Sequence, residues 1–425
     1  MTQFGIETLV LHGGHDLDSS LSRAVPIYQT SAFSFESTDA AGQLFDGTMD
    51  GNIYTRLGNP TTRIFEKRIA LLEGGSDAVA TASGQSAVTS TFLSFIKSGD
   101  EIVSSSHLFV GTYCFFTSAL QQLNVKVHLV DPLDPEAFRK AITPKTKAIF
   151  TEIIGNPSLQ VPDLERIAQI AHEAEVPFIV DNTFGTPILS NPIKHGADIV
   201  VHSATKWIGG HGTSVGGVII EAGKFNWPAH KFPHFNEPDP TNHNIRYAID
   251  SPTTPLTKKI RTTFMRDYGP CLSPFNAFML LQGIETLPLR MERHAENALK
   301  VAQFLKNHPN VDWVFYPGLK SHLSYNNAEK YLPKGPGSMV CFGIKGGREI
   351  ARKFIEELKL WSHISNLGDA KSLVIHPAST SHRHMSSEEL KKANVPEDLI
   401  RLSVGIESIN DILGDLDQAL QASQI

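Results

Sequence analysis

The clearest chemical signal in the sequence is a lysine placed just after a buried strand. Residues 199–201 are Ile-Val-Val, an apolar β-branched run that predicts a strand of a parallel sheet covered on both faces. Lys206 follows almost at once, at the sheet edge where open α/β proteins bind their ligands. Partial burial there would lower the pKa of the amine and make it a nucleophile toward an aldehyde, as a Schiff base requires. An exposed lysine before a flexible glycine loop explains these residues equally well.

Two hydroxyl side chains precede this lysine. Ser203 and Thr205 lie two positions apart, so in extended backbone both hydroxyls would point the same way and could donate to one phosphate. The segment after the lysine allows sharp turns and close approach to a ligand, because it is rich in glycine: Gly209, Gly210, Gly212, Gly216 and Gly217.

A second anion site is predicted around Gly84 and Gln85. Residues 78–81 can form a short strand, Ser83-Gly84-Gln85 a tight turn, and residues 86–96 a helix whose first N–H groups point at the turn. The segment is neither a GxGxxG fingerprint nor a P-loop, which disfavours a nicotinamide or nucleotide ligand.

Asp181 ends another apolar run. It follows residues 178–180 (Phe-Ile-Val), where an unpaired buried carboxylate would cost several kcal/mol and so needs a cationic partner. Asp181 and Lys206 end successive strands, which places them at the same edge of the sheet; a turn or helix N-cap aspartate is the structural alternative.

Tyr54 and Arg56 alternate with Thr55, so both side chains could bind one anion. A surface Tyr-Arg pair without a ligand is the simpler interpretation.

The overall pattern predicts an α/β protein. Residues 1–60 show few periodic signals and indicate an extended arm with turns. Strands are expected at 101–104, 125–130, 148–153 and 176–182, alternating with helices at 112–123, 135–141 and 164–174. This alternation predicts right-handed βαβ units and a largely parallel sheet between helices. Residues 222–270 are proline-rich and irregular, a pattern typical of a binding site or interface. The final part, 285–425, mixes strands and helices and fits a smaller α+β domain.

Composition excludes several classes of function. The 425 residues carry a net charge of -6, without the basic excess of a nucleic-acid-binding protein, and no apolar run approaches the ~18 residues of a transmembrane helix. We expect a cytoplasmic protein, because the sequence has three scattered cysteines and no signal peptide. His376, His382 and His384 lack a carboxylate at ligand spacing, so no metal site is expected.

Several long motifs together resemble one enzyme family. The chain contains YTRLGNPTTR, ASGQSA, VDNTFGTP, HSATK, SLVIHPAST and RLSVGIE, and it resembles the Cys/Met-metabolism family of pyridoxal-phosphate (PLP) enzymes, which includes cystathionine γ-synthase, along its whole length. It is most similar to the O-acetylhomoserine sulfhydrylase branch, through LSPFNAFMLLQGIETLPLRMERH, YLPKGPGS and NLGDAKSLVIHPASTSH. The resemblance implies the fold type I of PLP-dependent transferases, with a mostly parallel seven-stranded sheet. It also implies three regions: an arm at 1–60 that reaches a neighbouring subunit's site, a PLP-binding domain at 61–284 and a small domain at 285–425. The expected assembly is a homotetramer, a dimer of dimers.

The resemblance also implies roles for individual residues. Lys206 would hold the cofactor as a Schiff base and shuttle protons, and Asp181 would keep the pyridinium nitrogen protonated. Arg401 would bind the substrate α-carboxylate, with Asn366 beside it where relatives often have serine. The remaining implied contacts are to the ring hydroxyl, from Asn156, and to the phosphate, from Gly84, Gln85, Ser203, Thr205, Tyr54 and Arg56. Tyr54 is also implied in substrate binding.

One position departs from the family. Phe109 stands where relatives usually have a tyrosine that stacks on the cofactor ring and offers its hydroxyl to proton transfer. Phenylalanine keeps the stacking but loses the hydroxyl, and nearby Tyr113 is an alternative source of one.

The implied reaction is γ-replacement: O-acetyl-L-homoserine and sulfide give L-homocysteine and acetate, in methionine biosynthesis. Lys371, where cystathionine synthases and lyases commonly have glutamate, and the insertion at 222–268 favour this activity. Cystathionine γ-synthase and methionine γ-lyase are the alternatives within the family, and a non-catalytic interaction module, supported by Phe109 alone, is the alternative outside it. Free sulfide or the thiocarboxylate of a sulfur-carrier protein could supply the sulfur.

Overall fold

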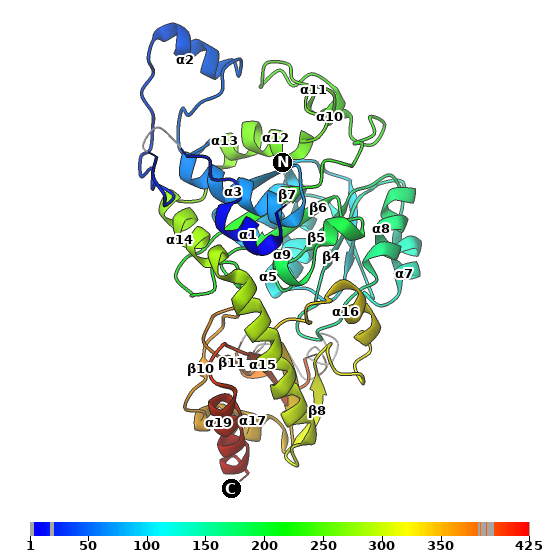
Figure 1. Cartoon of the computed structure of the whole chain (residues 1–425). Coiled ribbons are helices and arrows are strands. Elements are labelled where there is room, and N and C mark those ends of the chain that lie inside the picture. Colours follow the sequence, from blue (N-terminus) through cyan, green and yellow to red (C-terminus); the bar gives the residue numbers. More distant parts are fainter. Residues whose placement is uncertain (1–3, 18–20, 381–382, 384–387, 389–394, 425) are drawn as a thin grey trace.

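The computed structural model describes residues 4–17, 21–380, 383, 388 and 395–424. These residues form two β-sheets, each covered by helices, and one long helix, α15 (Leu287–Asn307), runs from the first sheet to the second (Figure 1). The described C-terminal end lies at the far end of the smaller part.

The first sheet has seven strands in the order β1-β7-β6-β5-β4-β2-β3. Only β7 runs antiparallel to its neighbours, so the prediction of a mostly parallel seven-stranded sheet is confirmed. The strands are β1 (Asp77–Thr81), β2 (Glu101–Ser105), β3 (Lys126–Val130), β4 (Thr146–Glu152), β5 (Phe178–Asp181), β6 (Ile199–Ser203) and β7 (Gly217–Glu221).

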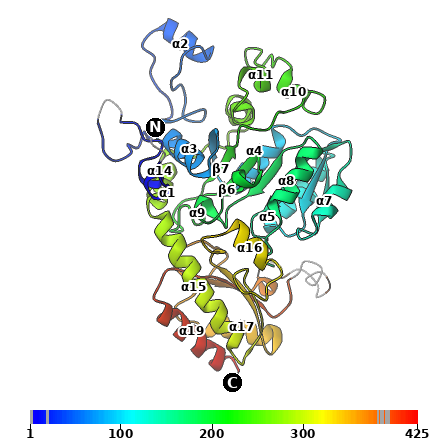
Figure 2. The same ribbon diagram turned by 45° about the vertical axis from the view of Figure 1, so that its right-hand side comes forward.

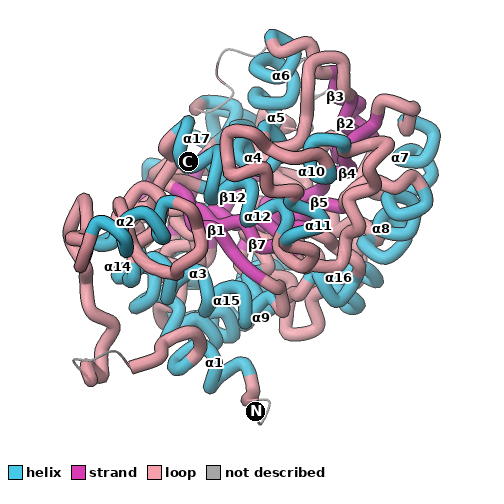
Figure 3. The backbone as a smooth tube through the Cα atoms, turned by 90° about the horizontal axis from the view of Figure 1, so that it is seen from above, coloured by secondary structure: helices cyan, strands magenta, loops and turns pink. Residues whose placement is uncertain are grey.

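Both faces of this sheet are buried, which explains the continuous apolar runs of its central strands. Ile179 and Val201 pack on the face covered by α4, whereas Val180 and Val200 pack on the face covered by α3, α8 and α14. Because side chains alternate along a strand, Asp181 and Ser203 share the α4 face with Ile179 and Val201 (Figure 3 shows α4 over the strands). The helices through this part are α3 (Pro60–Glu73), α4 (Gly84–Leu93), α5 (Val110–Cys114), the π-helix η1 (Phe115–Ala119), α6 (Leu120–Gln122), α7 (Pro135–Ala141), α8 (Leu164–Glu173), α9 (Thr186–Leu189), the 3₁₀ helix η2 (Pro192–His195) and α14 (Pro274–Glu285).

The N-terminal arm is more regular than its sequence indicates. It contains two short helices, α1 (Ile6–His12) and α2 (Thr38–Phe45), so the expectation of extended chain throughout is wrong. Helix α1 packs on α3 and α14, but α2 buries no residue and stands away from the rest of the chain (Figure 1). Helices of seven and eight residues are too short to give a clear periodic signal.

The proline-rich segment also contains short helices: α10 (Pro233–Asn236), α11 (Tyr247–Asp250), α12 (Pro255–Lys259), the π-helix η3 (Ile260–Phe264) and α13 (Met265–Tyr268). The expectation of wholly irregular chain is therefore wrong here too. Aromatic side chains hold the segment onto the α4 face of the sheet, with Trp227 stacked on Phe235 at 4.1 Å between ring centres.

The second sheet has the order β10-β11-β12-β9-β8 and confirms the smaller α+β part (Figure 2). Its strands are β8 (Val311–Phe315), β9 (Met339–Ile344), β10 (Ser362–His363), β11 (Leu373–Ile375) and β12 (Leu399–Ser403). The accompanying helices are α16 (Tyr325–Tyr331), α17 (Gly347–Glu357), the 3₁₀ helix η4 (Pro377–Ser379) and α19 (Ile409–Ala422). Within the described ranges, no helix combines the length and apolarity needed to cross a bilayer.

Candidate active site

Lys206 lies in a tight turn directly after β6, largely shielded from water. Its Nζ donates a hydrogen bond to Asn366 Oδ1 at 2.6 Å, and the turn is closed by Gly210 N donating to Lys206 O at 2.7 Å. Burial, together with the nearby Arg401 guanidinium, lowers the pKa of Lys206 to about 8. About a tenth of such an amine is neutral at pH 7, against a few parts in ten thousand at the ordinary pKa, and the neutral form is the one that a nucleophile requires; the role itself stays a prediction.

Arg401 is partly buried on β12, in the second sheet. Its Nη1 lies 3.5 Å from Asn156 Oδ1, and no carboxylate among the described residues pairs with it. Burial lowers the pKa of the guanidinium without neutralising it. A partly buried cation without an acidic partner is suited to bind the carboxylate of a ligand.

Asp181 ends β5, beside β6, as the sequence predicts. Its Oδ1 accepts from Thr183 N at 2.9 Å, and Thr183 Oγ1 in turn accepts from Ser203 N at 2.8 Å. Thr183, which sequence reasoning missed, therefore ties the carboxylate to the strand that leads to Lys206. Burial raises the pKa of Asp181, while the hydrogen bonds from Thr183 oppose that rise.

Gly84 forms a cradle with Ser203 at the start of α4. The Ser83 side chain caps this helix by accepting from Ser86 N at 3.0 Å. A Cβ on Gly84 would overlap Ser203, so the first turn of α4 approaches Ser203 as closely as only glycine allows. The unpaired N–H groups of Gly84 and Gln85 and the Ser203 hydroxyl thus converge on a site suited to a phosphate.

The prediction for Thr205 is wrong in its geometry. Strand β6 ends at Ser203, and Thr205 lies in the following turn, so the two hydroxyls do not share one face of an extended strand. Thr205 Oγ1 donates to Gly216 O at 3.2 Å and accepts from Gly216 N at 3.1 Å. Its contact to a phosphate remains a prediction.

Phe109 is held in place by a buried acid that sequence reasoning also missed. Glu152 ends β4 opposite Asp181, and its Oε1 accepts from Phe109 N at 2.6 Å. Burial, reinforced by the Asp181 charge, raises the pKa of Glu152 well above its usual value. The Phe109 ring and the Gln85 side chain both lie against Gly111, which places the ring beside the start of α4. The signal for Glu152 was an acid ending an apolar strand, the same signal that identified Asp181.

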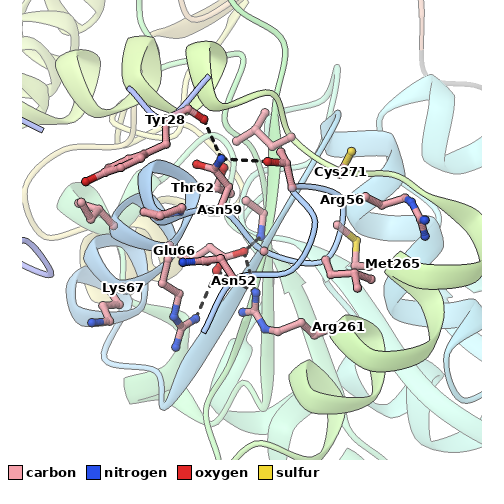
Figure 4. A pocket seen from close by; sticks show the side chains of 18 of the residues that line it. Tyr28, Asn52, Arg56, Asn59, Thr62, Glu66, Lys67, Arg261, Met265 and Cys271 are labelled. Carbon is pink, nitrogen blue, oxygen red and sulfur yellow. Dashed lines mark hydrogen bonds and ion pairs between the residues drawn. The ribbon is translucent and has the colours of Figure 1, made fainter. Parts of the chain in front are cut away.

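Tyr54 and Arg56 lie together, but their contacts are with another part of the chain. The Arg56 guanidinium is 5.4 Å from the centre of the Tyr54 ring, and its Nη1 donates to Arg266 O at 2.5 Å. Arg56 also lines a cavity of about 760 Å³ beneath the arm, together with Asn59, Glu66, Lys67 and Arg261 (Figure 4). Lys206 and Arg401 are not part of this lining.

His376 is engaged with its neighbours. Its two ring nitrogens lie 2.8 Å from Ser379 Oγ and 2.8 Å from Glu397 O. His382 and His384 lie outside the described residues. In the described part of the chain, no group of three potential metal ligands is present.

Comparison with known proteins identifies the family. Residues 7–421 match the family described as Cys/Met metabolism PLP-dependent enzyme. The chain belongs to this family. Family relatives include an O-acetyl-L-homoserine sulfhydrylase of Leptospira meyeri, 51% identical over 98% of this chain and 97% of the relative, and a homocysteine synthase of Schizosaccharomyces pombe, 50% identical over 98% of both.

A solved structure of the family shows the same fold. A Campylobacter jejuni protein with the assigned activity of O-acetylhomoserine (thiol)-lyase superposes with a TM-score of 0.94 at 39% identity, covering 98% of this chain and 100% of its own. One lysine of that protein carries a pyridoxyl phosphate group. The expected fold type and the expected cofactor, pyridoxal 5'-phosphate, are therefore confirmed.

The residues of this chain fit that cofactor. Lys206 offers the amine for the aldehyde, Asp181 a carboxylate for the ring nitrogen, and the Gly84-Ser203 cradle the donors for the phosphate. Asn156, which is expected to contact the ring hydroxyl, lies within 3.5 Å of Arg401 through its Oδ1. The contacts of each with the cofactor stay predictions.

Proposed function

We propose that the protein converts O-acetyl-L-homoserine and hydrosulfide to L-homocysteine and acetate with PLP as cofactor, a step of methionine biosynthesis. One observation carries the proposal: the Lys206 amine and the Arg401 guanidinium lie close enough for one to lower the pKa of the other, and neither pairs with an acid among the described residues. An amino-acid substrate needs both groups: the amine acts at its reacting carbon, and the guanidinium binds its carboxylate. The name of the Leptospira relative supplies the amino-acid substrate, O-acetyl-L-homoserine, and the name of the Schizosaccharomyces relative supplies the product, homocysteine.

The chain's residues bind and orient the substrate and move its protons. Arg401 binds the α-carboxylate through its guanidinium, which fixes Cα near Lys206. The bound cofactor supplies an electron sink for the charge that develops at Cα. Lys206, whose amine is neutral in about a tenth of the molecules at pH 7, accepts the proton from Cα and then exchanges protons at Cβ. The Cγ–O bond breaks with its electron pair leaving on acetate, and hydrosulfide forms the new Cγ–S bond.

Phe109 supports an ester substrate over a thioether. A leaving carboxylate is the weak base of an acid with a pKa of about 4, whereas a leaving thiolate is the stronger base of a thiol with a pKa of about 8.5 or above. The thiolate therefore gains more from a proton donor. Phe109 supplies no hydroxyl at its position. This favours sulfhydrylase activity over methionine γ-lyase activity, and other acyl or phosphoryl esters of homoserine are the alternative substrates.

The proposed function includes an assembly in which subunits share their active sites. Arg56 bonds to Arg266 of its own chain and lines a cavity that Lys206 does not line. The family resemblance supports service of Tyr54 and Arg56 at a neighbouring subunit's phosphate site, with an arm at 1–60 that crosses between subunits. We propose a homotetramer of this kind, with domains at 61–284 and 285–425, located in the cytoplasm. Free sulfide is the proposed donor, and a sulfur-carrier protein would be the alternative.

The first test is spectroscopic. The purified protein should be yellow, and Lys206→Ala should lose the visible absorbance; a colourless wild type that PLP cannot colour would refute the proposal and leave the non-catalytic interaction module.

The second test is kinetic. Homocysteine formation from O-acetylhomoserine should be faster with hydrosulfide than cystathionine formation is with cysteine, and methionine should release no thiol. Cysteine as the better acceptor would identify a cystathionine γ-synthase, and thiol release from methionine a γ-lyase.

A further inference from the structure

The buried face of α15 carries polar side chains where an amphipathic helix normally has apolar ones. Arg290, His294 and Asn297 follow one another at spacings of four and three residues and are 5%, 0% and 2% exposed. Buried polar groups at such positions need hydrogen-bond partners, and these three find them on main-chain carbonyls.

Arg290 binds the turn that carries Lys206. Its Nη1 donates to Trp207 O at 2.7 Å, and its Nη2 donates to Ile208 O at 3.3 Å and to Gly283 O at 2.6 Å. Burial lowers the pKa of Arg290 to about 10, which leaves it charged at neutral pH, so these are charge-assisted bonds.

Glycine makes this approach possible. Gly210, in the same turn, has a φ of +72°, and a Cβ there would overlap the Arg290 guanidinium. A Cβ on Gly283, at the end of α14, would overlap the carbonyls of Ile208 and Gly209. The Lys206 turn therefore lies directly against the backbone of α14 at Gly283, and it contacts α15 through the Arg290 guanidinium.

The other two residues bind the segment that follows Arg401. His294 Nδ1 donates to Val404 O at 2.7 Å, three residues beyond Arg401. Asn297 Nδ2 donates to Gly405 O and to Glu407 O, both at 3.0 Å. Burial lowers the pKa of His294 to about 4, so the ring is neutral at pH 7 and its Nδ1–H is the donor.

We propose that Arg290, His294 and Asn297 are positioning residues, and that α15 is a rigid spacer that sets the separation of the Lys206 amine from the Arg401 guanidinium. The inference rests on the proposed function, which needs one amino acid to reach both groups. The three side chains span about 10 Å of helix axis, a length that the backbone hydrogen bonds of a helix hold fixed. A misplacement of about 1 Å between such groups costs on the order of 100-fold in rate.

The test measures, in the PLP-loaded enzyme, the effects of substitutions at the two ends of the spacer separately. L-Homoserine, which has the amino and carboxylate groups but no acetyl group, is titrated by calorimetry to give its Kd. His294→Leu and Asn297→Leu should raise that Kd and the KM for O-acetylhomoserine by roughly tenfold or more. They should leave unchanged the pH at which the absorbance of the bound cofactor changes.

Arg290→Lys should instead shift the pH of that colour change and lower kcat by roughly tenfold or more, because lysine cannot reach three carbonyls at once. His294→Asn, whose amide can replace the Nδ1–H donor, should restore the Kd for homoserine. The matched control is Arg293→Lys on the exposed face of the same helix, which should leave all values unchanged.

The outcomes are distinguishable. If His294→Leu lowers the thermal midpoint but binds homoserine as the wild type does, α15 is merely structural and the proposal is overturned. If Arg290→Lys does not fold, the His294 pair of variants decides the proposal by itself. A colourless wild type would refute the proposed function instead, whatever the variants do.

Discussion

Replacing Lys206 with methionine should stabilise the cofactor-free protein at neutral pH, although it removes the central reactive group. The lysine ammonium is desolvated in the fold, and no carboxylate among the described residues compensates for it. Methionine fills a similar volume without a charge, so the folded state no longer bears the cost of a half-buried cation.

The magnitude follows from the pKa of Lys206 in the two states. The amine has a pKa of about 8 in the folded protein and 10.5 as the ordinary value. That difference corresponds to about 3 kcal/mol of destabilisation when both states are protonated. The hydrogen bond to Asn366, worth about 1 kcal/mol, is lost in the variant, which leaves a net gain of about 2 kcal/mol.

The difference in unfolding free energy between the variant and the wild type changes sign with pH. Below pH 8 the amine is charged in both states and the full cost is present. Between 8 and 10.5 the folded protein releases its proton before the unfolded chain does, so the wild type gains stability as the pH rises. Above 10.5 the cost is gone, and the variant should be less stable than the wild type by about 1 kcal/mol.

The assay is urea unfolding of cofactor-free wild type and variant at pH values below, within and above this window. Lys353→Met, on the exposed side of α17, is the control and should change the unfolding free energy by no more than about 0.5 kcal/mol. If Lys206→Met is less stable than the wild type at every pH, the lysine is not desolvated and the basis of its reactivity is wrong.

Three further outcomes are expected. Arg401→Lys should raise the KM for O-acetylhomoserine by roughly 10- to 100-fold, because the variant loses a charged bidentate contact worth about 1.5–3 kcal/mol. An unchanged KM would show that the substrate α-carboxylate binds elsewhere. Phe109→Tyr should introduce thiol release from methionine, assayed with a thiol reagent, and no release would show that the missing hydroxyl does not set the leaving group. Glu152→Gln should have a higher free energy of urea unfolding than the wild type, by a margin that grows as the pH rises above 4.5. The reason is that the pKa of Glu152 is raised in the folded state, so ionisation of the carboxyl destabilises the wild type and not the variant. Equal pH dependence of the two proteins would contradict the burial of Glu152.

Much of the site could be predicted because its residues follow local rules. Asp181 ends one apolar strand and Lys206 follows the next, and parallel strands bring such positions to one edge of a sheet. Gly84 opens a helix that follows a short strand, and unpaired N–H groups gather at the start of a helix. These signals depend on a few neighbouring residues, so they can be read along the chain.

Other features could not be predicted because they depend on contacts between distant segments. The extended geometry expected for Thr205 failed because the strand ends early and the side chain binds the backbone of Gly216. The same local rule that found Asp181 applies to Glu152, but only the structure shows that Glu152 holds Phe109.

The sequence by itself determined the alternating strands and helices, the apolar faces of the first sheet and the chemical types of the reacting groups, because these follow from periodicity and from side-chain chemistry. The tertiary structure decided that the turn with Lys206 meets Asn366 from 160 residues away and that Arg401 meets Asn156 across 245 residues. It also decided that Arg290, which in the sequence is one more helical arginine, faces the carbonyls around the lysine. The physical reason is that the reactivity of Lys206 comes from desolvation and a nearby charge, and both exist only when separate segments pack together.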